Sequence, residues 1–398
     1  MISVEVALER VLAGCRPTAP EMVALPAALG RVLAEGVVAR VAHPPLDVSA
    51  MDGYAVRAAD LGAPARLTVI GESAAGHPFD GNLAPGQAVR IFTGAAIPDG
   101  ADAVVMQEDT SRDGDTVVIN TTTTAGRHVR ARGLDFLPGQ PMLSAGTVMG
   151  PRQIALAAAM NVPWLSVRRR PRVAVLSTGD EIAMPGEPMG PAQLASSNGP
   201  GLAALISVLG GEPVQLGIAK DSRDSLSAMV AAATGCDLLV TSGGASVGDY
   251  DLVQDVLAEH GLKLDFWKIA MRPGKPLMFG ALKHVPVLGL PGNPVSAMVC
   301  AYVFLAPMLR ALQGLGGGLP VVPAVLGADV RANDARQEYM RARLRRDDGR
   351  LVATPHTKQD SAVVSGLAAA DGFIIRPPHA PEARAGEAVL VMPLPDGM

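Results

Sequence analysis

Three carboxylates in the second half of the chain follow three different predicted strands and could act together. Glu181 follows a strand over 172–176, Asp221 follows one over 214–219, and Asp251 follows one over 237–241. The carboxyl ends of parallel strands meet at one edge of a sheet, where ligands bind. Converging carboxylates suit Mg²⁺, which prefers oxygen ligands and bridges phosphates. Singly, each carboxylate is as easily a helix cap or a solvated residue, but together they predict a metal or phosphate site with these three residues as metal ligands.

The loop that follows the strand over 237–241 has the composition of an anion-binding loop. Its glycines let the backbone approach a ligand, its serines offer hydroxyls, and the helix after it presents free N–H groups. Asp249 follows the last glycine where a Walker A loop has lysine, so a phosphate on a small ligand fits better than ATP hydrolysis. Tight turns alone would also explain the glycines. The binding candidates are Ser242, Gly243, Gly244, Ser246 and Gly248.

Two further loops at the same predicted edge are small and polar. One leads from the strand over 172–176 to Glu181, and the other follows a strand over 285–290 and precedes an apolar helix. Because helices begin after both loops, their free N–H groups favour anionic ligands there as well. The substrate-binding candidates from these loops are Ser177, Thr178, Gly179, Asp180, Pro291, Gly292 and Asn293.

A cationic cluster is predicted at Lys268, Arg272 and Lys275, in a segment stiffened by prolines. Such a cluster can hold a phosphate or an oxyanion substrate, although a solvated charged face is the simpler alternative. Only six of the 34 Lys and Arg residues are lysines, and four of these six lie between 263 and 283. A chain that otherwise uses arginine and keeps lysine here indicates a need for compact point charges.

Polar residues beside glycines also stand out in the first half of the chain. They are Asp52 before Gly53, Thr93 before Gly94, and Arg130 and Asp135 on either side of Gly133. Asp-Gly is a turn signal, so Asp52 could serve only to shape a turn. Spacing alone assigns these residues no chemistry.

The composition narrows the class of protein. The 398 residues carry a net charge of −4, with 48% hydrophobic and 18% charged residues, which argues against a nucleic-acid binder and against a disordered chain. The three cysteines are far apart, as expected for small buried side chains in a reducing cytosol, so we expect a cytoplasmic protein. The most apolar stretch, 295–309, is shorter than a bilayer span and predicts a buried helix rather than a membrane anchor.

The apolar pattern predicts the elements that must position these residues. The first 42 residues indicate a helix and then a strand over 36–40, short strands fill 43–140, and a helix follows over 151–160. From 172, four strand–helix steps predict a doubly wound parallel sheet, with Asn198 as the N-cap of its first helix. After a glycine-rich linker over 314–320, alternating segments predict a small all-β domain, which makes the chain multidomain α/β plus β.

Taken in order, seven segments resemble the molybdopterin molybdenumtransferase family, also called MoeA, which includes the gephyrin E domain. They are SAMDGYA (49–55), FTGAAIPDGADAVVMQE (92–108), RARGLD (130–135), LSTGDEI (176–182), TSGGASVGDYD (241–251), RPGKP (272–276) and GLPGNPVSA (289–297). No single motif is unique to the family, but the ordered set, spanning about 250 residues, is highly specific.

The resemblance implies an elongated homodimer with four parts in each chain. They are a split helical region over 1–42 and 141–170, an inserted β-rich domain over 43–140, a molybdopterin-binding α/β domain over 171–315, and a C-terminal β-barrel domain over 316–398. In this family the active cleft lies between the α/β domain of one subunit and the β-rich domain of the other. That gives Asp52, Thr93, Arg130 and Asp135 a place in the site.

The implied reaction inserts molybdate into adenylylated molybdopterin, with Mg²⁺-dependent cleavage and release of AMP. Glu181, Asp221 and Asp251 would support the metal, and Lys268, Arg272 and Lys275 would draw in molybdate. These six residues and Asp52 form the implied catalytic set. Arg341 and Ser361 match C-terminal substrate-binding positions of the family. The resemblance also implies contacts with the molybdopterin adenylyltransferase and with acceptor molybdoenzymes. Arg272 departs from the lysine of many members, and 358–363 keeps only part of a Gln-Gly-Ser pattern.

Two other classes of function remain open at this level. One is another enzyme on the same α/β fold, either a molybdopterin adenylyltransferase or a nucleotide-pyrophosphate hydrolase, although the N-terminal motifs are superfluous for both. The other is a non-catalytic scaffold like gephyrin, which would not need the three carboxylates. The sequence leaves open the choice between molybdate and tungstate, the metal ligands and the downstream acceptors.

Overall fold

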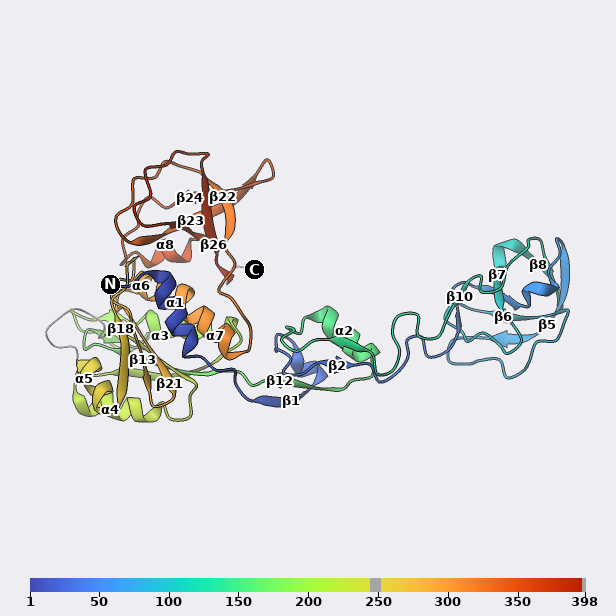
Figure 1. The fold of residues 1–398 in the computed structure, drawn as a ribbon, viewed down its shortest axis with the longest axis horizontal. Helices are drawn as coiled ribbons and strands as arrows, with labels where there is room; N and C mark the ends of the chain where they lie inside the picture. Colours follow the sequence, from blue (N-terminus) through green and yellow to red (C-terminus); the bar gives the residue numbers. More distant parts are fainter. Residues whose placement is uncertain (244–251, 396–398) are drawn as a thin grey trace. The chain divides into compact units, whose positions relative to one another are not determined.

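The structure, a computed structural model, describes residues 1–243 and 252–395 and divides into two compact units. The first unit comprises 1–21, 30–34 and the described residues from 167 onward, and the second comprises 22–29 and 35–166. Figure 1 shows the ribbon of both units. The finer four-part division of the chain stays a prediction.

A mixed six-stranded sheet forms the α/β core of the first unit, in the order β16-β13-β17-β21-β20-β18. Its strands are β13 (Arg172–Thr178), β16 (Glu212–Ala219), β17 (Leu238–Ser242), β18 (Leu262–Trp267), β20 (Met278–Leu282) and β21 (Val285–Leu290). The four strands β16, β13, β17 and β21 are parallel, which confirms the predicted doubly wound sheet. The sequence did not predict β18 and β20, which are antiparallel to their neighbours. Because the direction reverses twice, the carboxyl end of β18 lies at the same edge as that of β21.

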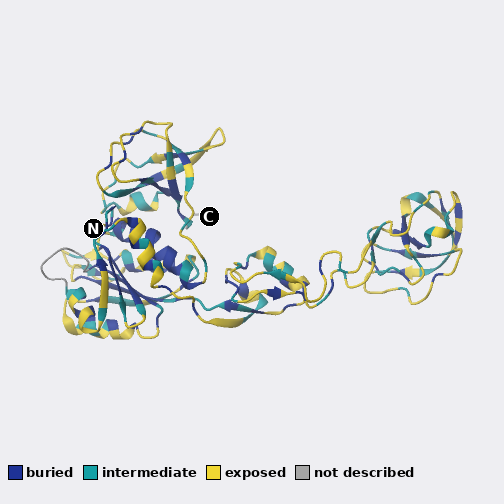
Figure 2. Cartoon of the chain, in the orientation of Figure 1, coloured by how far each residue is buried: buried dark blue, intermediate teal, exposed yellow. Residues whose placement is uncertain are grey.

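Helices cover both faces of this sheet (Figure 1). One face packs against α1 (Val4–Ala13), α3 (Asn198–Val208) and a long helical run formed by α6 (Pro294–Cys300), η4 (Ala301–Leu305) and α7 (Ala306–Leu312). The other face packs against α4 (Arg223–Ala232) and α5 (Leu252–Glu259). The alternation of inward side chains explains this sandwich: Val173 and Val175 lie in one core, and Ala174 and Leu176 lie in the other. Figure 2 shows the central strands of the sheet and the helical run over 294–312 as largely buried.

The helical run Pro294–Leu312 is long and apolar enough to cross a membrane by length and composition, with a mean hydropathy of 1.8. However, 83% of this window is buried inside the protein, so it is the central helix of the core. The prediction of a buried helix over 295–309 is therefore confirmed.

A closed five-stranded barrel follows, which confirms the all-β domain that the sequence predicts and the barrel that the resemblance implies. It consists of β22 (Val322–Leu326), β23 (Gln337–Asp347), β24 (Arg350–Pro355), β25 (Gly372–Arg376) and β26 (Ala388–Pro393), with the short helix α8 (Val364–Ala368) between β24 and β25. Pairing of β23 with both β24 and β25 closes the ring. A two-residue strand from the α/β region, β19 (Met271–Arg272), joins the start of β23 in parallel. A second short parallel pair, β14 (Ile182–Ala183) and β15 (Leu194–Ala195), lies after β13.

A curled six-stranded sheet in the order β7-β4-β6-β5-β9-β8 forms the core of the second unit. Its strands are β4 (Gly53–Val56), β5 (Ala65–Ser73), β6 (Gln87–Ile91), β7 (Ala103–Met106), β8 (Thr110–Asp113) and β9 (Thr116–Ile119), with the 3-10 turns η2 (Ala58–Asp60) and η3 (Gln107–Asp109). The Gly- and Pro-separated β runs of the sequence lie in these strands, which confirms a β-rich fold here.

Small elements complete the chain on either side of the curled sheet. They are β1 (Pro20–Ala24) with β12 (Trp164–Arg168), β2 (Val37–Val38) with β11 (Pro141–Leu143), β3 (Val48–Ser49) with β10 (Val129–Arg130), η1 (Leu25–Ala28) and α2 (Pro151–Ala159). The strand predicted over 36–40 is only two residues long, whereas the helix predicted over 151–160 is present.

The three cysteines are all buried and unpaired. Burial raises the pKa of Cys15 to about 12 and also raises the pKa of Cys236 and Cys300. The prediction of small buried side chains rather than a disulfide framework is confirmed by this placement.

Candidate functional site

A pocket of 390 Å³ lies at the carboxyl edge of the parallel strands in the first unit. Loops after β13, β17 and β21 contribute to its wall, as the sequence predicted. The predicted residues that line it are Ser177, Thr178, Glu181, Ser242, Gly243, Pro291, Gly292 and Asn293. Three of the hydroxyl residues, at positions 177, 178 and 242, are at most 3% exposed, so their polar groups belong to the pocket rather than to the outer surface.

Asn198 ties two of these loops together. Its Nδ2 donates to Ser242 Oγ at 2.7 Å and to the carbonyl of Gly292 at 2.8 Å. The prediction of Asn198 as an N-cap is wrong, because it is the first helical residue of α3 and Ser197 occupies the cap position. The side chain instead faces the ends of β17 and β21, where it fixes the spacing of the loops.

One wall of the pocket was not predicted from the sequence: it is the segment that runs from β14 to the start of α3. Its lining residues are Ile182, Leu194, Ala195, Ser196, Ser197 and Asn198. The polar run Ser-Ser-Asn at the start of a predicted helix was an available signal, but a polar helix start is usual for capping and so did not indicate a ligand.

Gly243 is a glycine for a reason visible in the pocket. Its φ of +97° lies in the left-handed region, and a Cβ there would lie 2.5 Å from the carbonyl oxygen of Thr178. The Thr178 hydroxyl is buried and has no hydrogen-bond partner within the described residues, so it is available to a ligand. Four predicted site residues, Gly244, Ser246, Gly248 and Asp251, lie outside the described residues.

The carboxylates of the first two loops do not all meet. The carboxylate of Glu181 lies over Gly179, where a Cβ would come within 2.4 Å of Glu181 Oε2, and Glu181 lines the pocket. Asp180 Oδ1 instead accepts the backbone N–H of Asp221 at 3.2 Å, and neither residue lines the pocket. Among the residues that the structure describes, no three potential metal ligands of His, Cys, Asp or Glu converge. The predicted triad is therefore only partly assembled by the described loops.

The barrel domain reaches this edge of the sheet through Ser361. The Ser361 carbonyl accepts from the backbone N–H of Val295 at 3.2 Å, and its Oγ accepts from Asn293 Nδ2 at 3.2 Å. The barrel thus contacts the first turn of α6 directly beside the pocket. The predicted residue Ser361 lies next to the predicted residue Asn293, which sequence distance could not reveal.

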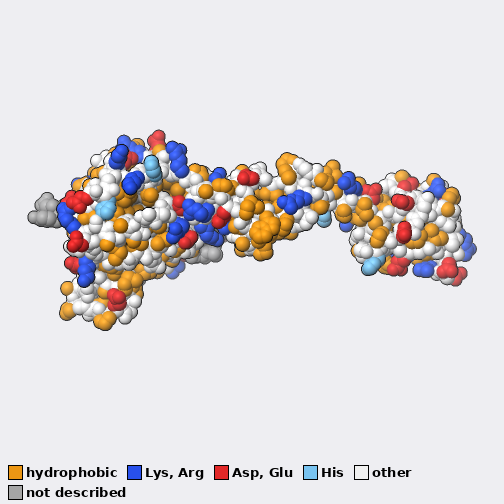
Figure 3. Space-filling model, turned by 90° about the horizontal axis from the view of Figure 1, so that it is seen from below, with side chains coloured by type: hydrophobic (Ala, Val, Ile, Leu, Met, Phe, Trp, Pro, Cys, Tyr) orange, Lys and Arg blue, Asp and Glu red, His pale blue; other side chains and the backbone are white. Residues whose placement is uncertain are grey.

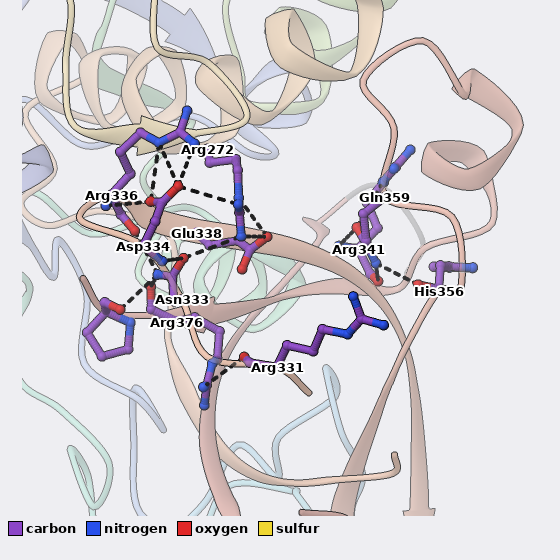
Figure 4. Close-up of polar contacts among 11 residues, drawn as sticks. Arg272, Arg331, Asn333, Asp334, Arg336, Glu338, Arg341, His356, Gln359 and Arg376 are labelled. Carbon is purple, nitrogen blue, oxygen red and sulfur yellow. Dashed lines mark hydrogen bonds and ion pairs between the residues drawn. The ribbon is translucent and has the colours of Figure 1, made fainter. Parts of the chain in front are cut away.

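Arg341 holds the loop that carries Ser361. The residue is 1% exposed and its guanidinium donates to the carbonyls of Lys358 and Asp360 at 3.1 and 2.9 Å, and to that of Val363 at 2.9 Å. Figure 4 shows Arg341 beside Gln359 and His356 of the same loop region. Burial lowers the pKa of Arg341. Since these carbonyls occupy the Nη1 and Nη2 groups and Gln359 contacts Nε, the described contacts use Arg341 as a scaffold and not as an open anion ligand.

The predicted cationic cluster does not form three equivalent free cations. Arg272 pairs with Glu338 at 2.7 Å and with Asp334 at 3.5 Å, both in the barrel domain (Figure 4). Lys268 Nζ lies 4.4 Å from the centre of the Trp267 ring, and Lys275 is exposed. From this segment only Pro276 lines the pocket. The cluster differs from the prediction because Asp334 and Glu338, more than sixty positions later in the chain, form ion pairs with Arg272.

In the second unit the structure brings Asp52 and Thr93 together. Asp52 Oδ1 accepts from the backbone N–H of Thr93 at 2.7 Å and from its Oγ1 at 2.8 Å. These bonds, with Arg90 nearby, lower the pKa of Asp52. Arg90 lies over the rings of Tyr54 and Phe92 and donates to the carbonyl of Gly53 at 3.0 Å. The exposed carboxylate is therefore fixed and ionised.

The Asp52-Gly53 pair is not a turn, contrary to the turn interpretation of the sequence. Gly53 begins β4, which runs between β6 and β7, and a Cβ on it would lie 1.8 Å from the carbonyl oxygen of Val105. Glycine is needed here because the neighbouring backbone is too close for any side chain.

A second pocket, of 600 Å³, lies within the second unit. The predicted residues Arg130 and Asp135 line it, beside Gly94, which follows Thr93. The pairing of β10 with β3 places Arg130 opposite Val48 and so joins the segment over 130–135 to the segment over 49–55. The four predicted site residues of the first half are thus gathered in one region of this unit.

Comparisons with known families and proteins cover nearly all of the chain. Residues 2–161 match the MoeA N-terminal region (domain I and II), 174–311 match a probable molybdopterin binding domain, and 323–394 match the MoeA C-terminal region (domain IV). Together these three profiles account for both units.

Individual relatives agree with the profiles. Proteins named molybdopterin molybdenumtransferase are 39% identical over 387 residues in Nostoc sp. (94% of this chain, 89% of the relative) and 35% identical over 382 residues in Haemophilus influenzae (95% and 94%). The crystal structure of a molybdopterin biosynthesis MoeA protein from Pyrococcus horikoshii is similar with a TM-score of 0.88 at 35% identity, and covers 100% of both chains.

Proposed function

The chain belongs to the MoeA family of molybdopterin molybdenumtransferases and acts in molybdenum cofactor biosynthesis, and from that premise we propose the reaction that its site performs. The substrate is adenylylated molybdopterin, and the second substrate is molybdate. Cleavage of the phosphoanhydride bond releases AMP and leaves molybdenum on the dithiolene sulfurs. The observation that carries this proposal is the pocket at the carboxyl edge of the sheet, with its buried hydroxyls and its carboxylate.

The pocket suits a phosphate-bearing ligand. Ser177, Thr178 and Ser242 offer hydroxyls in a recess of 390 Å³, whose wall also includes Gly243. The Thr178 hydroxyl needs a partner because an unpaired buried polar group costs free energy. We propose that the phosphate and the pterin end of the substrate are held by these groups together with Pro291, Gly292 and Asn293.

In this proposal the carboxylates act in catalysis or metal binding, and the lysines attract the oxyanion. Glu181, which lines the pocket, is the acid–base or metal-supporting carboxylate, and Asp221 and Asp251 assist it. Lys268 and Lys275 attract the oxyanion because they make no ion pair within the described residues. Asp52 with Thr93, and Arg130 with Asp135, would be contributed by the other copy of the chain in the homodimer.

We include Mg²⁺ in the proposal on the chemistry of the donor set. Magnesium in phosphate-binding sites uses one or two protein carboxylates and completes its shell with water and substrate phosphates. Glu181, which lines the pocket, meets that minimum by itself, without a closed cage of protein ligands. The metal would neutralise charge on the phosphates during cleavage.

The proposal also includes a cytoplasmic homodimer. Met22 on β1 and Trp164 on the paired β12 are 61% and 56% exposed. Large apolar side chains that lie together on the surface mark a site of contact with another protein. Figure 3 shows hydrophobic side chains gathered over this part of the molecule. A second copy of the chain is the partner we propose for it. Transient contacts with the adenylyltransferase that supplies the substrate, and with acceptor molybdoenzymes, complete the proposal.

The decisive experiment is AMP release from adenylylated molybdopterin, measured with and without molybdate and in parallel with tungstate. We expect release that depends on molybdate, is abolished by EDTA and returns with Mg²⁺. Glu181→Gln should lower the rate at least about a hundredfold while substrate binding persists, because general acid–base groups contribute about that factor. Glu187→Gln is the matched control, since Glu187 only accepts from the backbone of Met184 in a nearby loop.

The outcomes separate the remaining alternatives. Adenylylation of molybdopterin by ATP would favour an adenylyltransferase, and AMP release without molybdate would favour a pyrophosphate hydrolase. Substrate binding without any AMP release would favour a scaffold.

A further inference from the structure

The loop over 268–277, which we call the cation loop, is attached to the barrel domain through β19. Met271 pairs with Gln337 and Arg272 pairs with Glu338, and the backbone N–H of Gln337 donates to the carbonyl of Ala270 at 2.9 Å. The centre of the loop is therefore an additional strand of the barrel, although its two ends continue the α/β sheet as β18 and β20.

Arg272 reinforces this attachment with its side chain. Nε and Nη2 both reach Glu338 Oε1, at 2.9 and 2.7 Å, Nη1 lies 3.5 Å from Asp334 Oδ2, and Nη2 is 3.4 Å from Asn333 Oδ1. Glu338 is only 15% exposed in its side chain, so this pair is partly shielded from water. Figure 4 shows the guanidinium turned toward these barrel residues. A planar fork with several donors suits such a multi-acceptor site, where a lysine would supply one point charge.

The acceptor side also has partners within the barrel. Arg336 donates to Asp334 from both its side chain and its backbone N–H, and these bonds, with a smaller contribution from the charge of Arg272, lower the pKa of Asp334 to about 2. Asn333 is 8% exposed, and its Nδ2 donates to the carbonyls of Arg336 and Pro377. The barrel thus presents a preformed, anionic socket to the arginine.

The two lysines of the same loop are in a different situation. Within the described residues neither makes an ion pair, and Lys268 has a φ of +80°, a conformation that residues with side chains rarely adopt. Such a conformation persists only where the surroundings impose it. Here the Lys268 N–H donates to the carbonyl of Leu277 at 3.1 Å, and the Ile269 N–H donates to that of Lys275 at 3.0 Å.

We propose that Arg272 is a positioning residue: by docking into the socket formed by Glu338, Asp334 and Asn333, it holds the cation loop so that Lys268 and Lys275 face the oxyanion substrate. The inference deepens the proposed function and, for its kinetic part, rests on it. In this proposal the barrel domain fixes the conformation of the cation loop, which connects β18 and β20 of the α/β sheet.

A double-mutant cycle tests the inference with amide hydrogen exchange of peptides that cover 268–277. We expect Arg272→Gln and Glu338→Gln each to speed exchange about tenfold, because each breaks the same docking contact. The double variant should be no worse than either single variant, since the two residues act as one unit. Arg272→Lys should restore part of the protection. Lys275→Gln is the control, and it should leave exchange at the wild-type level.

Steady-state kinetics provide a second test, because a loss of stability alone would not change the KM for molybdate selectively. We expect Arg272→Gln and Glu338→Gln to raise the KM for molybdate severalfold with little change in kcat, and Arg272→Lys to recover part of that loss. If Glu338→Gln leaves both exchange and KM unchanged while Arg272→Gln raises KM, Arg272 is itself an oxyanion ligand and the inference is overturned. If the wild-type protein releases no AMP, the proposed function fails, whereas the exchange cycle still decides how the loop is held.

Discussion

Two arginines of β23, two residues apart, differ in burial and in the partners that they bind. Arg341 points inward, is 1% exposed and binds three backbone carbonyls of the loop over 358–363. Arg343, two residues later on the same strand, is 61% exposed in its side chain and pairs with Asp371 at 3.3 Å. The resemblance assigned Arg341 to substrate binding, but its contacts indicate that it acts through Ser361 by ordering that loop.

Replacing Arg341 with glutamine should therefore cost stability. We expect a loss of about 3 kcal/mol, because buried carbonyls lose a charged donor and stay unsatisfied. Arg343→Gln is the matched control and should cost less than about 1 kcal/mol, as exposed ion pairs do. Calorimetry of the unfolding transition measures both. Equal losses in the two variants would contradict the scaffold role.

Asp52 provides a pH-dependent test at the same scale. The two hydrogen bonds from Thr93 lower its pKa in the folded protein below the ordinary value of 3.8. A carboxyl group whose pKa is lowered on folding stabilises the protein above its unfolded pKa, and this contribution disappears as the pH falls through the folded pKa. Thr93→Val removes the hydroxyl donor and should move the pKa of Asp52 back toward 3.8.

The measurement is a carbon-13 NMR titration of the Asp52 carboxyl in both proteins. Thr93→Ser keeps the hydroxyl and should keep the lowered pKa. An unchanged pKa in Thr93→Val would show that the side-chain bond contributes nothing.

At the scale of elements, β4 depends on a glycine. Gly53→Ala places a methyl group 1.8 Å from the Val105 carbonyl oxygen in the middle of the curled sheet, so the strands must separate. We expect a loss of more than about 3 kcal/mol, at the upper end for overpacking. Gly62→Ala is the control, because no heavy atom lies within 4 Å of the added group and its φ is not positive. Thermal unfolding followed by circular dichroism distinguishes the two, and a stable Gly53→Ala protein would disprove the close approach.

Much of the fold could be predicted because its signals are local. Continuous apolar runs identified β13, β17 and β21, and the wide spacing of glycines and prolines identified the β-rich region. The antiparallel strands β18 and β20 were missed although β18 alternates polar and apolar residues, because the prediction followed strand–helix steps and neither of these strands is followed by a helix. The apolar helical run continues to Leu312 past the proline at 307, because this proline lies in the first turn of α7, directly after the π-helical segment η4.

The candidate site could be predicted only in part, for a different physical reason. The loops after parallel strands converge by topology, so Ser177, Ser242 and Asn293 were found. The partners of Arg272 and the neighbour of Ser361 come from the barrel, which no local pattern connects to these loops. Asn198 was read as a cap, because a side chain that bridges two distant loops looks the same in sequence as one that caps a helix.

At the scale of the whole molecule, the exposed apolar surface of β1 and β12 provides a test of the proposed homodimer. Trp164→Glu and Met22→Glu each place a charge on the exposed apolar surface of β1 and β12, and we expect both to convert a dimer into monomers. Leu390→Glu, which changes a residue that is 52% exposed on the barrel, should leave the dimer intact. Sedimentation velocity at micromolar concentration measures the result. A wild-type protein that sediments as a monomer would refute the homodimer.

The burial of the three cysteines has a consequence for metal handling. In the proposed reaction molybdenum is transferred to sulfur ligands of the substrate, and a thiolate on the protein would compete for it, since thiolates are strong ligands for soft metals. Burial raises the pKa of all three thiols, so none is a thiolate at neutral pH. The dithiolene of the substrate then meets no rival sulfur donor from Cys15, Cys236 or Cys300, and the metal cannot be diverted to these side chains while the fold is intact.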